Sequence, residues 1–344
     1  MKPDSIIAER LAEMEISENE SLYPPFPRIL MFELVNACNH ACIICASSQK
    51  TRKPGFMDAA LFYRLIQEGY DLGARELALY STGEPTLDKR LPAFVNKAKE
   101  IGYTYIYLTT NGSAELEFYH SLVQAGLHSL KFSINGITRD SYLLTHGKDN
   151  FDKAMTNLIS LDKWRKENKH PLRLLVSFVY TKLTENEQTL AKEKIGPFVD
   201  DLWILPLNDL GGQMYEIYQI LKPTDCSPPP TPKMAKPCFM LWKRMHISQD
   251  GYLTICCVDF DNTLAICDLN NMSLLDAWHH PLFAEIRKRH LSQQLDGTLC
   301  KNCLYQINEP FIPLNPALAT SPDPKKSKRN LERVQKALKS SVNE

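Results

Sequence analysis

Three cysteines stand close together near the N-terminus, at Cys38, Cys42 and Cys45, in a C-x3-C-x2-C spacing. Thiolates are soft ligands that suit iron–sulfur clusters or zinc, and a structural zinc site would need a fourth ligand. His40 is available in principle, but it falls inside the tight loop, where it is awkwardly placed to reach the same metal. Three cysteines leave one iron of a four-iron cluster without a protein ligand, and such an open iron is a place for chemistry.

Composition and charge narrow the class of protein. The 344 residues are 44% hydrophobic and 23% charged, which is ordinary globular usage. The 40 basic and 40 acidic residues cancel, so the chain lacks the broad positive field that nucleic-acid binding requires. The N-terminal segment is acidic and amphipathic, and no apolar run reaches membrane-spanning length, so we expect a cytoplasmic protein with no membrane partner. Ten cysteines in a reducing compartment indicate metal or catalytic roles.

Strand and helix patterns alternate over the first two-thirds of the chain. Apolar, β-branched runs predict six strands, at 29–35, 76–81, 104–109, 129–134, 173–180 and 202–207. Helical periodicity predicts helices at 57–71, 88–101, 114–125, 151–166 and 184–195, with caps at Asp58, Asp88, Ser113 and Thr184. This alternation favours parallel pairing with right-handed crossovers. We expect an α/β fold, a partial (β/α)6 TIM-like barrel whose functional loops lie at the C-terminal ends of the strands.

The chain divides into five predicted segments. They are an N-terminal extension (1–27), the barrel (28–212), a proline-rich linker (213–237), a small C-terminal domain (238–315) and a basic tail (316–344). In the C-terminal domain, Asp250-Gly251 predicts a hairpin turn between two alternating runs, and a helix is expected near 273–293. For the tail we expect a solvated or frayed helix.

Three further motifs stand at predicted strand ends. They are Ser81-Thr82-Gly83-Glu84-Pro85, Thr109-Thr110-Asn111-Gly112 and Ser133-Ile134-Asn135-Gly136, after the second, third and fourth strands. Together with the cysteine motif, and in this order, they resemble the radical S-adenosylmethionine (radical SAM) superfamily, whose members often have GGEP, TNG and S-x-D-G there. The resemblance covers roughly residues 28–207. Thr82 departs from it, because it stands in place of the first glycine of GGEP.

The resemblance implies a catalytic [4Fe–4S] cluster on Cys38, Cys42 and Cys45. It further implies that S-adenosylmethionine chelates the open iron, and that an electron donor such as flavodoxin or ferredoxin reduces the cluster, so that a 5′-deoxyadenosyl radical forms. Several side chains would bind S-adenosylmethionine: Glu84 its ammonium, Gly83 by close backbone approach, Ile44 over the adenine, and Asn111, Ser133 and Asn135 at the ribose or the carboxylate. Asn111 and Ser133 could instead simply cap the following helices.

A second set of cysteines lies in the C-terminal domain. Cys238 and Cys256 flank Gly251 in the pattern C-x12-G-x4-C, and Cys300-x2-Cys303 follows. This arrangement resembles the SPASM/twitch extension of radical SAM enzymes. From Cys226 onward there are seven cysteines, whereas two complete clusters need eight, so we expect one auxiliary [4Fe–4S] cluster with these four ligands. A structural zinc site remains open as an alternative.

The other cysteines of this region have weaker assignments. Cys257 could exchange with Cys256 as a ligand, although consecutive residues of a strand point to opposite faces. Cys226 and Cys267 are expected to be small buried hydrophobic residues. Any of the three could also return a hydrogen atom to a substrate radical, and Cys257 is therefore one catalytic candidate.

His146 is the other catalytic candidate. It lies where relatives often have an arginine before glycine, and it is either a substrate contact or proton acceptor, or an ordinary surface or helix-terminal histidine. Asp259 and Asp261 are further candidate bases, or else hairpin-end turn residues.

The arrangement of the clusters suggests a reaction. A single four-cysteine auxiliary cluster resembles that of twitch-bearing dehydrogenases, which oxidise a secondary alcohol on an aminocyclitol. This resemblance implies redox chemistry on a small polar metabolite: removal of a carbinol hydrogen, loss of a proton to a base, and transfer of an electron to the second cluster.

Two alternatives stay open. One is maturation of a ribosomally made peptide, although only about 28 residues precede the first strand, where such enzymes often have a recognition domain. The other is an iron–sulfur redox carrier without radical chemistry, against which the Gly83-Glu84-Pro85 motif argues. The molybdopterin-precursor cyclase, similar in outline, is less favoured because its auxiliary cluster has three cysteines and its chain ends in a glycine pair, whereas this chain ends in Val342-Asn343-Glu344.

Overall fold

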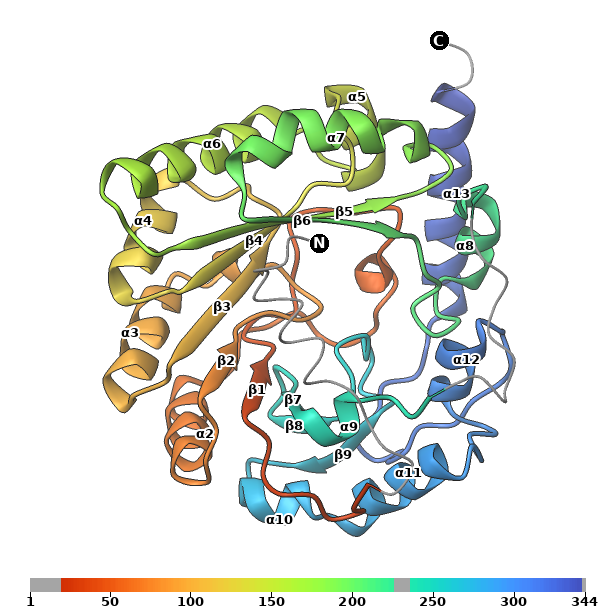
Figure 1. The fold of residues 1–344 in the computed structure, drawn as a ribbon. Helices are drawn as coiled ribbons and strands as arrows, with labels where there is room; N and C mark the ends of the chain where they lie inside the picture. Colours follow the sequence, from red (N-terminus) through yellow and green to blue (C-terminus); the bar gives the residue numbers. More distant parts are fainter. Residues whose placement is uncertain (1–19, 226–235, 342–344) are drawn as a thin grey trace.

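One nine-stranded sheet forms the centre of the molecule (Figure 1). The computed structural model describes residues 20–225 and 236–341. The strands are β1 (Ile29–Phe32), β2 (Glu76–Ala78), β3 (Tyr105–Thr110), β4 (Ser129–Ser133), β5 (Arg173–Tyr180), β6 (Asp201–Pro206), β7 (Arg244–Ile247), β8 (Tyr252–Thr254) and β9 (Ala265–Asp268). Their order is β6-β5-β4-β3-β2-β1-β7-β8-β9, and β1 to β6 pair in parallel. The prediction of six parallel strands in an α/β fold is confirmed, and the sheet is open, with β6 and β9 at its edges.

Helices cover the outer face of the parallel strands (Figure 1). They are α2 (Ala59–Asp71), α3 (Leu91–Ile101), α4 (Leu116–Ala125), α5 (Arg139–His146), α6 (Phe151–Glu167) and α7 (Gln188–Ile195). Asp58 caps α2 as predicted, since its carboxylate accepts from the backbone N–H of Leu61. Ser113 does not cap α4: its N–H donates to the side chain of Asn111 in a turn, so the helix begins two residues later, after Glu115.

The strands alternate between two faces. Leu30 and Phe32 of β1, and Leu130 and Phe132 of β4, belong to the main hydrophobic cluster beneath the helices. Because successive side chains of a strand point to opposite faces, residues such as Met31 and Lys131 face the concave side of the sheet. The functional loops therefore lie at one rim of a concave surface whose far side is packed by helices.

The C-terminal region extends the same sheet. β7 pairs in parallel with β1, and β7, β8 and β9 then form antiparallel pairs. The predicted hairpin is confirmed, and Gly251 adopts a positive φ of 85° at its turn. The prediction of a single helix at 273–293 is wrong. The structure has α10 (Leu274–Trp278) and α11 (Pro281–Leu291), because Pro281 has no N–H to continue α10 and instead starts α11.

Three further short helices lie in the described part of the chain's second half. α8 (Tyr215–Leu221) forms inside the segment expected to be a linker, α9 (Met240–Lys243) precedes β7, and α12 (Leu299–Tyr305) contains the last two cysteines. Among the described residues no helix is both long and apolar enough to cross a membrane.

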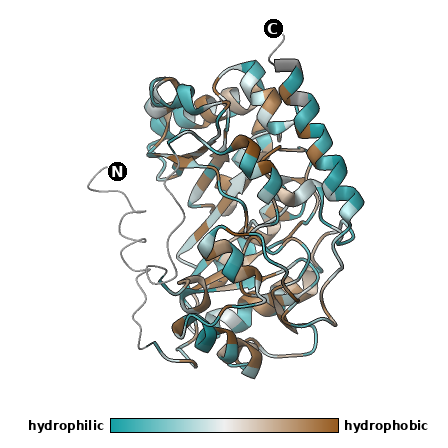
Figure 2. Cartoon of the chain, turned by 90° about the vertical axis from the view of Figure 1, so that its right-hand side faces the viewer, coloured by the Kyte–Doolittle hydropathy of each residue, from teal (hydrophilic) through white to brown (hydrophobic). Residues whose placement is uncertain are grey.

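The C-terminal helix α13 (Pro324–Ser341) corrects the expectation of a solvated or frayed tail. Val334 is fully buried, and Leu331 and Leu338 pack with it in a second hydrophobic cluster with α8. One face of the helix is therefore buried, while its other face is largely hydrophilic (Figure 2). A weak apolar stripe is enough to hold this basic helix against the protein, because the stripe packs on the apolar surface that α8 provides.

Candidate active site and auxiliary metal site

The first cysteine set lies on the loop that follows β1. The loop ends in a short 3-10 helix, η1 (Ala46–Ser48), whose first backbone donors are partly satisfied by Cys45 Sγ, which accepts from the N–H of Ser47 at 3.4 Å. Cys38 Sγ accepts from the N–H of His40 at 3.5 Å. The loop is thus at the C-terminal end of a parallel strand, the position where functional residues of this class of fold gather.

The three thiols are buried close enough to influence one another. Burial raises the pKa of Cys38 to about 11, and the negative charges of Glu84 and Cys45 add to this rise. Burial also raises the pKa of Cys42 well above its usual range, and the charges of Cys45 and Cys38 raise it further. Three mutually repelling thiolates in a protein interior need a cation to bind them, so this donor set fits an iron–sulfur cluster.

Two elements distant in sequence hold this loop in place. The N–H groups of Ala41 and Ile43 donate to the carbonyls of His146 and Thr145, at the end of α5. From α13, the Arg333 guanidinium donates to the carbonyl of Ala41. The cysteine loop is therefore clamped by the end of α5 and by the C-terminal helix.

Glu84 is buried and already has several hydrogen-bond partners. It is 3% exposed, and it caps the 3-10 helix η2 (Pro85–Leu87). Its Oε1 accepts from the N–H and the hydroxyl of Thr86 and from the hydroxyl of Thr110. Its Oε2 accepts from the N–H of Asn111 at 2.7 Å. Since a carboxylate oxygen has two lone pairs, Oε2 keeps room for one more donor.

Gly83 permits a close approach between two loops. A Cβ built on it would lie 2.2 Å from the carbonyl oxygen of Val35 and 2.5 Å from that of Ala37. The N–H of Glu84 donates to the same Ala37 carbonyl at 2.8 Å. The motif at the end of β2 therefore needs glycine in order to pack against the cysteine loop.

Thr82, the departure from the family motif, belongs to a buried network. Its hydroxyl donates to Glu33, which forms an ion pair with Arg52 at 2.6 Å, and both charged side chains are almost fully buried. Arg52 also pairs with Asp250 of the hairpin turn and donates to the carbonyl of Phe260. Sequence reasoning missed this network, which ties the cysteine loop to the C-terminal region.

The other predicted S-adenosylmethionine contacts are also tied into the fold. Asn111 donates through Nδ2 to Asn39 of the cysteine loop at 2.8 Å. Asn135 accepts from the N–H of Val179 on β5. Ser133 ends β4 and is half-buried, and Ile44 packs against the second hydrophobic cluster. These residues gather at the rim that holds the cysteine loop, and their contact with S-adenosylmethionine stays a prediction.

His146 is buried at the end of α5. Its Nε2 accepts from the N–H of Asn135 at 3.1 Å, so the ring proton lies on Nδ1. Nδ1 faces Cys42 Sγ at 3.7 Å and His40 Nδ1 at 3.3 Å. Burial lowers the pKa of His146 to about 3, so the ring is neutral. His146 is thus a neutral donor beside Cys42; it is the last residue of α5, as one of the predictions had it, and it is not a surface histidine.

Lys50 is a second residue that sequence reasoning missed. It is 8% exposed, and its Nζ has no hydrogen-bond partner within the described chain. Its pKa is lowered by burial, while the charges of Glu33, Cys45 and Cys38 act in the opposite direction. A buried cation beside the cysteine set is available for an anionic group. Its position five residues after Cys45 is the only sequence signal that could have indicated it.

The second cysteine set lines one cavity. Cys238 precedes α9, Cys256 follows β8, and Cys300 and Cys303 lie on one face of α12, whose N-cap is Thr298. Leucine and isoleucine side chains form most of the remaining wall, together with His290 of α11. Burial raises the pKa of Cys238 to about 11, whereas Cys303 is the one exposed member of the set. Four thiols converging on one apolar cavity fit a fully ligated iron–sulfur cluster.

The structure corrects the argument that placed Cys257 on the far face of a strand. β8 ends at Thr254, so Cys256 and Cys257 lie in the turn that follows it. The Cys256 thiol donates a hydrogen bond to Cys257, which lowers the pKa of the Cys257 thiol. The two sulfurs are therefore neighbours. Cys267 is buried in the main cluster, and Cys226 lies outside the described residues.

Asp259 and Asp261 accept hydrogen bonds that stabilise turns. Asp259 is buried and accepts from Thr254, from both donors of Thr263 and from the N–H of Leu264. Asp261 accepts from the N–H and hydroxyl of Thr51. These bonds fit the turn roles that the sequence left open.

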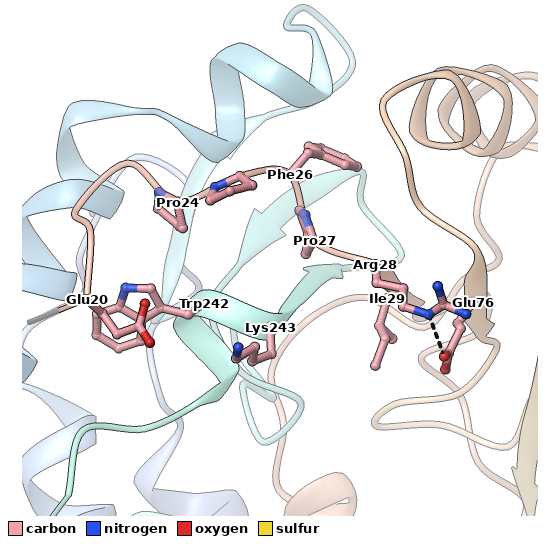
Figure 3. Close-up of a pocket in the computed structure, with 10 residues that line it drawn as sticks. Glu20, Pro24, Phe26, Pro27, Arg28, Ile29, Glu76, Trp242 and Lys243 are labelled. Atoms are coloured by element: carbon pink, nitrogen blue, oxygen red, sulfur yellow. Dashed lines mark hydrogen bonds and ion pairs between the residues drawn. The ribbon is translucent and has the colours of Figure 1, made fainter. Parts of the chain in front are cut away.

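A separate pocket lies at the N-terminal ends of β1, β2 and β7, at the end of the sheet opposite to the first cysteine set. It is lined by the segment before β1, by Trp242 and Lys243, and by the ion pair of Arg28 with Glu76 (Figure 3). These residues stand at the N-terminal ends of the strands, whose side chains in this class of fold contribute to stability more often than to catalysis.

Comparison with known proteins agrees with the two cysteine sites. The radical SAM superfamily model matches residues 32–192, and the SPASM model, an iron–sulfur cluster-binding domain, matches residues 238–304. The chain therefore contains a radical SAM domain followed by a SPASM domain. It is a radical SAM enzyme with a SPASM domain. Its cofactors are a [4Fe–4S] cluster and S-adenosylmethionine in the radical SAM domain, and auxiliary iron–sulfur in the SPASM domain.

Curated relatives match part of this radical SAM chain. A "Probable GTP 3′,8-cyclase" of Sulfolobus acidocaldarius is 28% identical over 145 residues, 42% of this chain and 45% of that protein. The 7,8-dihydro-6-hydroxymethylpterin dimethyltransferase of Methanocaldococcus jannaschii is 27% identical over 123 residues, 34% of this chain and 24% of that protein. The chain spans about half the length, or less, of these relatives.

Solved structures share the fold. BtrN in complex with AdoMet and 2-DOIA has a TM-score of 0.57 at 19% identity, covering 84% of this chain and 98% of that chain. Streptococcus suis SuiB bound to the precursor peptide SuiA has a TM-score of 0.60 at 16% identity, covering 81% and 69%. The anSMEcpe enzyme with bound AdoMet has a TM-score of 0.57 at 14% identity, covering 92% and 100%. At these identities the likeness shows the fold.

Proposed function

We propose that this radical SAM enzyme performs redox chemistry on a small polar metabolite such as a sugar or an aminocyclitol. Alcohol oxidation is the leading reaction, and dehydration or epimerisation are other outcomes of the same hydrogen abstraction. The observation that supports this proposal is the polarity of the concave face of the sheet.

Buried polar groups on that face lack partners within the described chain. They are the Thr109 hydroxyl on β3, the Trp203 indole nitrogen on β6 and both ring nitrogens of His246 on β7. Lys131 of β4 places its ammonium 4.8 Å from the centroid of the Trp203 ring. Burial lowers the pKa of Lys131 to about 8. A buried polar atom without a partner costs free energy, so these groups favour a ligand that bears hydroxyl, amino or acidic groups.

The cofactors supply the chemistry, and the chain positions it. When bound, the catalytic cluster and S-adenosylmethionine supply a radical able to remove hydrogen from an unactivated C–H bond. In our proposal Lys50 pairs with the carboxylate of S-adenosylmethionine, and the free acceptor site of Glu84 Oε2 takes its ammonium. Both charges are buried, so they fix the orientation of the ligand more firmly than surface groups would.

In alcohol oxidation one electron remains on the substrate after hydrogen abstraction and loss of a proton, and we propose that the auxiliary site accepts it. The substrate gives up a hydrogen atom, a proton and an electron: the hydrogen atom ends in 5′-deoxyadenosine, the proton goes to a base, and the electron goes to the auxiliary centre. In our proposal the cysteine cavity receives the electron, because Cys256 lines it and the next residue, Cys257, lies near enough to Lys131 of the concave face for the two charges to interact.

The test compares two panels of substrates. The reconstituted enzyme, with S-adenosylmethionine and a reductant, is incubated with sugars and aminocyclitols or with peptides, and 5′-deoxyadenosine is measured. We expect a polyol to increase its formation, to transfer deuterium from the carbinol carbon into it, and to yield a product lighter by two hydrogens. Stimulation by peptides alone would contradict the proposal and favour peptide maturation.

A further inference from the structure

His290 is a buried histidine of the auxiliary site whose role the cysteine pattern does not indicate. It is the last but one residue of α11, and it is 2% exposed. It lines the same cavity as Cys238, Cys256, Cys300 and Cys303. The rest of that wall is apolar, formed by side chains such as Leu241, Ile255 and Leu299.

The backbone fixes the proton of this ring. The N–H of Cys238 donates to His290 Nδ1 at 3.4 Å, so Nδ1 acts as an acceptor and has no proton. The ring hydrogen is therefore on Nε2. That atom is buried and has no hydrogen-bond partner among the residues described. A buried N–H in an apolar wall needs an acceptor, and the four thiolates of this cavity, or the sulfides they bind, are the acceptors at hand.

We infer that His290 donates a hydrogen bond from Nε2 to a sulfur of the auxiliary cluster and thereby raises its reduction potential. A hydrogen bond to a cluster sulfur stabilises the extra negative charge of the reduced state, which makes electron uptake more favourable. The inference deepens the proposed function, because it rests on the auxiliary centre being the electron acceptor.

The experiment measures the potential of the auxiliary cluster alone. The full chain with Cys38, Cys42 and Cys45 replaced by alanine is reconstituted with iron and sulfide, so that only the C-terminal cluster forms. A potentiometric titration is followed by electron paramagnetic resonance (EPR). We expect His290→Leu to shift the potential to more negative values. In His290→Gln the amide N–H reaches a similar position to Nε2, so we expect the potential to stay close to that of the unmodified site.

Control variants separate this effect from a general disturbance of the fold. His120→Leu removes a histidine that packs against Trp164 on the helical side, and it should leave the potential unchanged. If His290→Leu does not fold, His290→Met provides an unbranched apolar side chain for the same comparison. In the unmodified site, proton ENDOR should detect an exchangeable hydrogen near the cluster that disappears in D2O.

Three results would overturn the inference. The first is an unchanged potential in His290→Leu at full iron content. The second is strong nitrogen coupling to the cluster of the unmodified site, together with loss of the cluster in both His290→Leu and His290→Gln. That result would make His290 a ligand. The third is zinc in place of iron at this site. Failure of the proposed function is distinguishable, because alcohol oxidation requires the first cluster, whereas this potential is measured without it.

Discussion

Lys50 brings a positive charge into the interior beside Cys38 and Cys45. A charge-assisted hydrogen bond contributes about 1.5–3 kcal/mol, so removing the ammonium should weaken S-adenosylmethionine binding roughly 10- to 100-fold. Lys50→Met is compared with Lys53→Met, in which an exposed lysine of the same loop is replaced. Anaerobic equilibrium dialysis with labelled S-adenosylmethionine measures the Kd. Equal affinity in the two variants would remove Lys50 from the binding site.

His246 makes stability depend on pH. Burial, with the charge of Arg244, lowers its folded pKa to about 3, whereas the unfolded value is about 6.5. Below pH 6.5 the unfolded chain therefore binds a proton that the folded chain does not, and stability falls as the pH falls. For one histidine the loss between pH 7 and pH 5 is about 2 kcal/mol.

The comparison of His246→Leu with the unmodified chain measures this contribution. Urea unfolding at pH 7 and pH 5 gives the free energy of unfolding in each case. We expect the decrease between the two pH values to be smaller in the variant by about 2 kcal/mol. An equal decrease in both proteins would show that His246 is not held neutral.

At the scale of elements, the buried pair of Arg52 and Glu33 joins the cysteine loop to the C-terminal hairpin. Arg52→Met leaves the Glu33 carboxylate buried without its partner, which costs about 3–5 kcal/mol. The double variant Arg52→Met with Glu33→Gln removes both charges and should recover part of the loss. Chemical unfolding measures both. A single variant as stable as the double would show that the ion pair is not needed to offset a buried charge.

The helix α13 should protect the cysteine loop that it contacts through Arg333. Val334→Asp places a charge at a fully buried position and should detach the helix, whereas Gln335→Asp changes an exposed neighbour. We expect the EPR signal of the first cluster to decay several-fold faster in air in Val334→Asp only. Equal decay in both variants would exclude a protective role for α13.

Sequence patterns predicted these elements unevenly. The six strands and the cap at Asp58 follow from local periodicity and local hydrogen bonding, so they could be read from the chain, whereas α3, α4 and α7 do not begin at the predicted caps Asp88, Ser113 and Thr184. The pairing of β7 with β1 could not, because parallel pairing depends on contacts far apart in sequence. The burial of Val334 depended likewise on a surface formed by α8.

The candidate site divides in the same way. The seven cysteines were predicted from the short C-x3-C-x2-C and C-x2-C spacings and from the resemblance of the longer pattern to SPASM/twitch domains. Lys50, Arg52 and His290 did not stand out, because lysine, arginine and histidine are usually exposed or half-buried, and only the folded chain shows that these three are buried.

For the whole molecule, one continuous sheet bears both cysteine sites. The first set follows β1, and the hairpin of β7 and β8 leads to Cys256 of the second set. Cys256 follows β8, which only β7 separates from β1, and the concave face with Lys131 belongs to the same sheet. This arrangement suits a reaction in which an electron passes from a bound substrate to a second centre.

The central claim is that two iron–sulfur clusters with different tasks occupy these sites. Its most direct test is to measure iron and sulfide per chain after anaerobic reconstitution, in the unmodified protein and in the Cys38/Cys42/Cys45→Ala variant, together with EPR spectra with and without S-adenosylmethionine. We predict two four-iron clusters, falling to one in the variant, and a spectrum that responds to S-adenosylmethionine only when the first cluster is present. A single cluster with zinc at the second site, or a spectrum indifferent to S-adenosylmethionine, would contradict the account.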